Sequence, residues 1–265
     1  MSDVLLAVPF GLAIGVAVGM LGGGGSVLAV PILVYVLGQG VSQATTMSLV
    51  VVTAGAVAGG LGHARHGRVC WRHAGSFTAA AVPGILVGTL VANAVSATLL
   101  LGAFAIVMLA AAGATWRNAD RDDDDGGSWE AGGSCPPLRL PRDLAAGVLI
   151  GFLTGFFGVG GGFLIVPTLA IALAFTMRTA VGTSLAIITA TSLLALAVHL
   201  VAGRTLPVEV TAAMTAGCIA GALAGVAAAN HVPQRVLGRG FALLVTAVAA
   251  YLLASAALLG GPPGS

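Results

Sequence analysis

Two clusters of glycine, each followed by hydroxyl side chains, are the residues of this sequence best suited to bind a small anion. The first lies in residues 15–31 (GVAVGMLGGGGSVLAVP) and the second in residues 151–167 (GFLTGFFGVGGGFLIVP). Glycine leaves its backbone N–H groups approachable, and a helix that restarts after the cluster directs the positive end of its dipole back toward it. Such a site holds an anion without a full positive charge in apolar surroundings. The residues predicted to bind the anion are Gly23, Gly24, Gly25, Ser26, Ser48, Gly160, Gly161, Gly162, Thr183 and Ser184.

The hydroxyls of this set follow each glycine cluster at a similar distance along the chain. Ser48 lies in ATTMSL, residues 44–49, while Thr183 and Ser184 lie in AVGTSL, residues 180–185. These hydroxyls can instead bond to the preceding helical turn or to a neighbouring helix. The glycines can likewise serve close helix packing, which is the role expected for the GxxxG stripes before each cluster. The stripes are Gly11, Gly15 and Gly19, and Gly147, Gly151 and Gly155.

Titratable and metal-binding side chains are sparse. His63 and His199 lie near the ends of apolar segments and are candidates for proton coupling, because imidazole titrates near neutral pH. No acidic residue is expected well inside an apolar span, which disfavours a cation transporter. The aspartates at 122–125 lack the spacing of a calcium loop, and we expect neither a metal nor a cofactor. The three cysteines show no metal spacing and are expected to be unpaired thiols: Cys70, Cys135 and Cys218.

Composition indicates the surroundings in which these residues work. The chain has 265 residues, of which 58% are hydrophobic and 8% are charged, and its mean hydropathy is +1.04. Soluble domains carry about 25% charged residues, and the apolar runs here reach the roughly 20 residues that cross a bilayer core. We therefore predict an all-α polytopic membrane protein with the lipid bilayer as its partner. The net charge of +2 is too small to indicate nucleic acid as a partner.

The chain divides into two similar halves around an acidic linker rich in glycine and proline. We predict a first membrane repeat at residues 1–115, the linker at 116–142 and a second repeat at 143–265. A shift of 136 positions aligns the glycine clusters, the proline after each and the two histidines; a shift of 137 aligns later glycines and an asparagine. Each repeat holds four or five hydrophobic segments, and its first two are short and flank the glycines. This short pair can form two tilted crossings, a re-entrant hairpin or one broken helix.

The distribution of arginine favours inverted repeats. The loop at 64–72 holds three arginines and the loop at 93–97 holds none, whereas the bias weakens or reverses in the second half. Because arginine-rich loops stay in the cytoplasm, inverted repeats place 64–72, the linker and 231–239 inside and both termini outside. Irregular backbone at membrane depth survives only within protein or beside water. Short glycine-broken helices at matched places therefore predict a cavity where the halves meet in the membrane.

These motifs resemble the TauE/SafE family of sulfite and sulfonate exporters, a branch of the toluene-sulfonate uptake permease group. The resemblance rests on GFLTGFFGVGGGFLIVPTLA, residues 151–170, followed by AVGTSLAIITATSL, residues 180–193, and on a weaker copy of both in the first half. The first copy departs from the second at Ser26 and at Thr46 and Met47. The resemblance implies a transporter of small sulfur oxyanions or sulfonates in the inner membrane of a bacterium, driven by an ion or proton gradient.

We therefore expect a secondary transporter that works by alternating access, and not an enzyme. An anion channel of the same architecture is the alternative, followed by an assembly partner. The GxxxG stripes can serve contacts within one chain or between two chains. The sequence therefore leaves open both a monomer and a homodimer.

Overall fold

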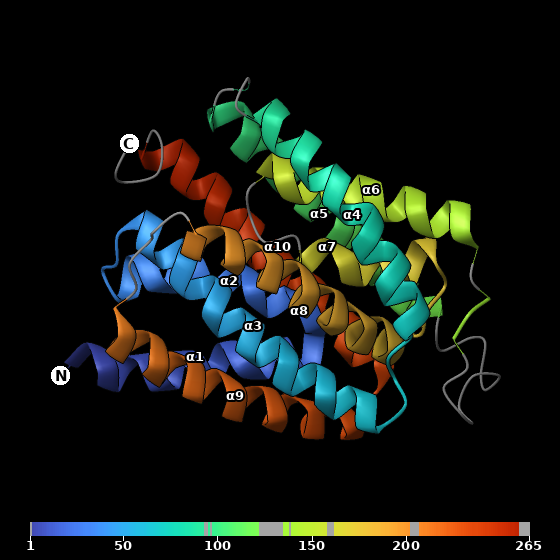
Figure 1. Ribbon diagram of the computed structural model, residues 1–265, viewed down its shortest axis with the longest axis horizontal. Coiled ribbons are helices and arrows are strands. Elements are labelled where there is room, and N and C mark those ends of the chain that lie inside the picture. The colour runs from blue at the N-terminus through green and yellow to red at the C-terminus, as the bar shows by residue number, and fades with distance from the viewer. Residues whose placement is uncertain are drawn as a thin grey trace.

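The computed structural model describes residues 2–92, 95, 97–121, 135–137, 139–157, 162–201 and 207–259. Within these ranges the chain forms helices and no strand (Figure 1). The α-helices are α1 (Ser2–Leu21), α2 (Ser26–Pro31), α3 (Val41–Arg65), α4 (Trp71–Ala92), α5 (Ala97–Arg121), α6 (Leu140–Phe157), α7 (Gly162–Pro167), α8 (Met177–Val201), α9 (Val208–His231) and α10 (Gln234–Leu259). The 3-10 turn η1 (Gly22–Gly25) joins α1 to α2, and the π-helical segments η2 (Ile32–Val36) and η3 (Thr168–Ala172) follow α2 and α7.

The predicted all-α polytopic membrane fold is confirmed. In a bilayer every backbone polar group must find a partner within the protein, which a helix provides internally. Among the described residues, five helical stretches are long and apolar enough to cross a membrane. They are Leu6–Val34, Gln43–Arg65, Trp71–Val91, Met177–Ala197 and Val208–His231.

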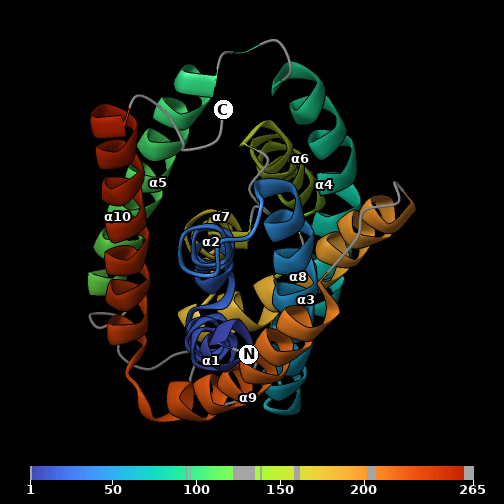
Figure 2. The same ribbon diagram turned by 90° about the vertical axis from the view of Figure 1, so that its left-hand side faces the viewer.

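The first of these stretches is not straight, because the chain reverses at the first glycine cluster. α1 ends at Leu21, and Gly22 takes a φ of +68°, a left-handed conformation that glycine adopts without a steric penalty. Gly25 then lies against the backbone of Ile14 and Val18 on α1. Figure 2 shows α2 beside α1, both seen end-on. This reversal argues against one broken helix for the short pair of the first half, whereas two tilted crossings and a re-entrant hairpin both agree with it.

The two halves interlock instead of forming separate bundles. α1 of the first half packs along α9 of the second, and α6 of the second half packs along α4 of the first. The glycine stripes make both contacts, since a Cβ atom at any of these glycines would meet backbone atoms of the facing helix. Their predicted packing role is confirmed, and it operates within one chain. Gly11, Gly15 and Gly19 face Met214, Cys218 and Ala222; Gly147, Gly151 and Gly155 face Phe77, Ala81 and Ile85.

These contacts follow the offsets read from the sequence. The pair Gly11 and Met214 becomes Gly147 and Phe77 when the first residue is moved by 136 and the second by 137. α1 begins at the left of the molecule, where the N-terminus is marked, whereas α6 begins at the right (Figure 1). Opposed directions and exchanged contacts are what inverted repeats would produce. Common descent of the two halves stays a prediction.

Arginine gathers at one end of the bundle, which we call the arginine end. It is the end at which α3, α5 and α9 finish and α4, α6, α8 and α10 begin, to the right in Figure 1. Every arginine of the chain except Arg204 lies within the last two or first two turns of one of these helices, or in a connection between them. The positive-inside rule therefore predicts that this end faces the cytoplasm.

Candidate functional site

The glycine segments of the two halves meet in the interior of the protein. All four residues of η1 are buried, and Gly23 lies directly on the backbone of Gly162, with no room for a Cβ atom between them. Figure 2 shows α2 and α7 side by side at the centre, with other helices around them. The sequence therefore located the meeting point of the halves correctly, and in this structure protein atoms fill it at Gly23.

Three of the predicted hydroxyls, those of Ser26, Ser48 and Ser184, donate hydrogen bonds within their own helical turns. Ser26 Oγ donates to the carbonyl oxygen of Gly23 at 2.6 Å, and Ser48 Oγ donates to Thr45 O at 2.8 Å. Ser184 Oγ donates to Val181 O, also at 2.8 Å. This is the bonding to the preceding turn that the sequence left open. A hydroxyl in this state can accept a hydrogen bond, and it must rotate before it can donate one to an anion.

Ser184 and Thr183 are adjacent in the chain but serve different places. Ser184 Oγ would lie 2.6 Å from a Cβ atom on Gly22, so this side chain faces the turn of the first hairpin. Thr183 Oγ1 instead accepts a hydrogen bond of 3.1 Å from the backbone N–H of Cys70, at the arginine end. Only Ser184 of the two thus belongs with the glycines. The hydroxyl of Thr183 thus bonds to Cys70. Its predicted role in binding the anion stays a prediction.

Of the remaining residues predicted to bind the anion or to couple protons, some pack against other side chains or helices and some lie outside the described residues. Gly24 lies against the ring of Phe241, and Gly25 against α1. Gly160, Gly161 and the side chain of His199 lie outside the described residues. Their predicted roles stay predictions.

His63 lies in the last turn of α3, near the end of its segment as the sequence indicated, and its side chain is fully buried. Its Nε2 atom lies 3.0 Å from the carbonyl oxygen of Gly19. An imidazole N–H that donates to a backbone carbonyl fixes the ring in one tautomer. This contact gives His63 a structural task at the end of α1, and its role in proton coupling stays a prediction.

Two guanidinium groups stand close together at the arginine end. Arg68 Nη1 donates to Asn230 Oδ1 at 2.6 Å, and Arg178 Nη2 donates to the carbonyl oxygen of Val232 at 3.1 Å. Burial, and then the charge of Arg178, lower the pKa of Arg68 below its ordinary value. Neighbouring cations held by amide oxygens keep much of their charge available to an approaching anion.

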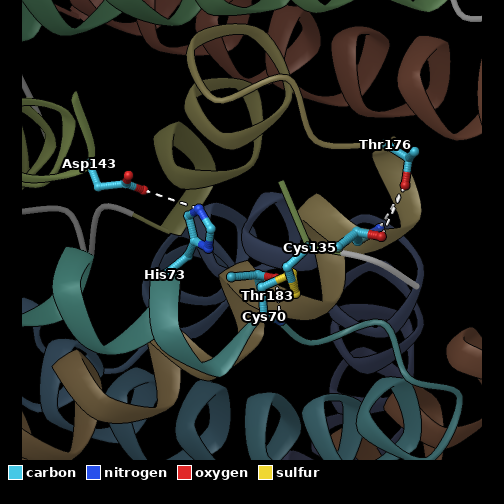
Figure 3. The surroundings of a disulfide bond; sticks show 7 residues. Cys70, His73, Cys135, Asp143, Thr176 and Thr183 are labelled. Atoms are coloured by element: carbon cyan, nitrogen blue, oxygen red, sulfur yellow. Dashed lines mark hydrogen bonds and ion pairs between the residues drawn. A yellow bond between two sulfur atoms is a disulfide. The ribbon is translucent and has the colours of Figure 1, made fainter. Parts of the chain in front are cut away.

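A cavity of about 190 Å³ opens at the same end of the bundle, at the start of α6. Its lining includes Pro136, Pro137, Arg139, Arg142, His73 and Asp143. His73 Nε2 lies 3.6 Å from Asp143 Oδ1, and both side chains are almost completely buried (Figure 3). Asp143 lies in the first turn of α6 and not well inside an apolar span, so the expectation about acidic residues is not contradicted, but its burial was not predicted.

The sequence held a signal for this pair that was missed. Asp143 precedes the second glycine stripe by one helical turn, and His73 precedes Phe77 by one turn. Residues four apart share a helix face, so Asp143 and His73 fall on the two faces that the glycines bring together.

A disulfide bond stands beside the cavity. Cys70, directly before α4, and Cys135, in the segment before α6, are joined by an S–S bond of 2.04 Å (Figure 3). The expectation of unpaired thiols is therefore wrong for these two, while Cys218 is free and buried. An odd number of cysteines excludes the pairing of all three, but it still allows one disulfide bond between two of them. The bridge forms because glycine packing of α4 against α6 brings the beginnings of these helices together.

Comparison with known proteins agrees with this architecture. Residues 7–252 match the family described as "Sulfite exporter TauE/SafE". A probable membrane transporter protein of Xylella fastidiosa is 31% identical over 264 residues, covering 95% of each chain. Similar proteins occur in Methanocaldococcus jannaschii, 29% identical over 209 residues and 72% of each chain, and in Bacillus subtilis, 28% identical over 228 residues, 77% of this chain and 80% of that one. No solved structure matches. This multi-pass membrane protein is a transporter and belongs to the TauE/SafE sulfite exporter family.

Proposed function

We propose that this protein is a secondary transporter that moves small sulfur-containing anions across the bacterial inner membrane by alternating access coupled to protons. Its substrates are sulfite, sulfonates or related organosulfur compounds, and it transports them without converting them chemically. The family description supports the sulfur chemistry. The clustering of arginine at one end supports an anionic substrate, because like-charged groups around an opening raise the local concentration of the opposite ion.

The observation that carries the mechanism is the closure at Gly23 and Gly162. The turn η1 and the start of α7, which belong to opposite halves, touch backbone to backbone at the centre, so a solute of several atoms that crosses here passes only if they separate. Packed interfaces switch between discrete arrangements instead of deforming continuously. A carrier built on this contact would open toward one side of the membrane while the other side stays closed.

Opening would also change what the glycines and Ser184 offer to a substrate. Separation of Gly23 from Gly162 would uncover backbone N–H groups, and Ser184 beside Gly22 could turn its hydroxyl from Val181 toward the gap. Hydrogen bonds from backbone amides and hydroxyls to an anion are charge-assisted and stronger than neutral ones. The predicted anion site would thus form only in the open states.

Flux into liposomes tests this proposal. The full chain is reconstituted, and uptake of sulfite, thiosulfate, sulfate, sulfoacetate, taurine and formate is measured with and without a pH gradient. We expect saturable flux of a sulfur-containing anion that the gradient accelerates. Rapid, non-saturating flux that ignores the gradient would favour the anion channel, and absence of flux for every sulfur compound would contradict the proposed substrate class.

A further inference from the structure

The cavity at the arginine end contains a buried carboxylate whose hydrogen-bonding capacity is unused. The side chain of Asp143 is 1% exposed, and neither of its oxygens has a hydrogen-bond partner, nor does Nδ1 of His73. The 3.6 Å between His73 Nε2 and Asp143 Oδ1 is longer than a hydrogen bond. A buried charge is costly unless it is paired and hydrogen-bonded. A ligand that enters the cavity therefore meets a buried pair whose hydrogen-bonding capacity is unfilled.

We propose that this cavity is an anion-binding vestibule whose occupancy is linked to protonation of the Asp143–His73 pair. The inference rests on the proposed function and names its coupling site. An anion in the cavity repels ionised Asp143, and protonation of the pair removes that repulsion. By thermodynamic linkage, a bound anion then raises the proton affinity of the pair, and a bound proton raises the affinity for the anion by the same factor.

The groups around the pair fit this assignment. Arg139 and Arg142 line the cavity from the segment before α6 and from its first turn, with exposed side chains that can meet an incoming anion. On the side of α8, the ring of Phe175 packs edge-on against His73 at 5.0 Å between centroids. The sulfurs of Cys70 and Cys135 are bonded to each other and do not titrate. Among the described residues, the other charged groups that line the cavity are thus cationic, which favours an anion in the space between them.

The size of the cavity matches a small oxyanion. A water molecule takes about 30 Å³ of liquid, so about 190 Å³ accommodates a sulfonate of few atoms together with some of its hydration water. The chemical class is set by the guanidinium groups, which bind planar or tetrahedral oxyanions through paired N–H donors.

The other helix pair shows that the Asp143–His73 contact is not needed for packing. One turn before Gly11 and Met214, the positions corresponding to Asp143 and His73 are Ala7 and Val210. Ala7 is fully buried in the hydrophobic core, and Val210 is partly buried against the same core. α1 and α9 thus make the same glycine-mediated contact with apolar residues at this level. Buried ion pairs are seldom more stabilising than apolar pairs of similar volume, which favours a role in binding over a role in folding.

Calorimetry on the purified full chain tests the proposal. The probe is methanesulfonate, which does not change its own protonation near neutral pH as sulfite does. Binding is measured across pH, and in buffers with different ionisation enthalpies so that linked protons are counted. For wild type we expect proton uptake on binding and an affinity that rises as pH falls, by up to about tenfold per pH unit for one linked proton.

The variants separate the pair from its surroundings. Asp143→Asn should bind methanesulfonate with no proton uptake and no dependence on pH, while Arg139→Gln combined with Arg142→Gln should lose at least about tenfold in affinity at every pH. His66→Gln, which changes an exposed histidine at the same end, should behave as wild type. If Asp143→Asn does not fold, Asp143→Ala with His73→Val reproduces the apolar pair of the other helix contact and should fold and lose the linkage.

The outcomes distinguish this inference from the proposed function. Binding by wild type with unchanged pH dependence in both Asp143 variants would overturn the vestibule and leave the proposed function standing. Unchanged affinity in the double arginine variant would overturn it as well. Failure of wild type to bind methanesulfonate and sulfite at any pH would overturn both.

Discussion

His63 Nε2 lies 3.0 Å from the carbonyl oxygen of Gly19, three residues before the turn at Gly22. The last four carbonyl groups of a helix have no partner within that helix, and α1 ends at Leu21. His63, from α3, thus satisfies one of these carbonyls at the point where the first hairpin reverses. This contact ties α3 to the hairpin that closes the centre of the protein.

The first prediction concerns this histidine. His63→Leu should destabilise the protein by about 1–3 kcal/mol, because it leaves the buried Gly19 carbonyl without a donor. His63→Gln keeps an N–H donor and should lose less. Thermal unfolding in detergent measures both, and the pH profile of flux is recorded for His63→Gln. If the flux of this variant no longer depends on pH while the protein stays folded, His63 is the proton-coupling residue.

The second prediction concerns the contact between the hairpins. Gly23→Ala places a methyl group on the backbone of Gly162, where neither side can yield without a shift of the main chain. We expect loss of flux together with a lowered melting temperature. Gly75→Ala is the matched control, since a Cβ at that helical glycine meets no atom within 4 Å. It should stabilise the protein by up to about 1 kcal/mol. A fully active Gly23→Ala would show that the main chain at Gly23 and Gly162 yields easily and that this contact does not control flux.

The third prediction concerns Ser184. Its hydroxyl bonds within its own turn, so Ser184→Ala should change stability little. If the hydroxyl turns toward a bound anion, the loss of one hydrogen bond to a charged ligand costs about 1.5–3 kcal/mol, which is tenfold or more in affinity. Substrate affinity from saturable flux is the measurement. Thr215→Val removes a comparable self-bonded hydroxyl on α9 and should keep wild-type affinity; equal losses in both would contradict a binding role for Ser184.

The fourth prediction concerns the disulfide and the side on which it lies. The bond closes a separation of 65 residues, and chain entropy predicts a stabilisation of at most about 4 kcal/mol. Reduction should therefore lower the melting temperature of the purified protein, and Cys70→Ser should remove this effect of reductant.

Arginine places this end in the cytoplasm, where thiols are kept reduced. We therefore expect Cys70 and Cys135 to be thiols in resting cells and to pair after oxidant treatment. Labelling with a thiol reagent that cannot cross membranes, applied to intact cells and to inverted vesicles, checks this. Labelling from outside intact cells, with or without prior reduction of the bond, would place the arginine end outside and contradict the orientation.

Much of the architecture could be predicted because it depends on local pattern. Backbone groups in lipid are satisfied in helices or in closed barrels, and apolar runs of about 20 residues favour helices. Glycine at every fourth position marks the helix faces that pack most closely. The longer apolar runs of the sequence accordingly form α3, α4, α8 and α9, and the stripes at Gly11 and Gly147 lie at close contacts.

The sequence by itself determined the fold class, the helical segments, the packing stripes and the meeting of the two glycine clusters. Tertiary structure alone decided that α1 pairs with α9 and α6 with α4, that Cys70 reaches Cys135, and that Asp143 is buried against His73. The physical reason is distance along the chain. Helix formation and face periodicity arise from neighbours within a few residues, whereas these contacts join residues 65 or more positions apart. Which faces meet depends on the whole assembly of helices.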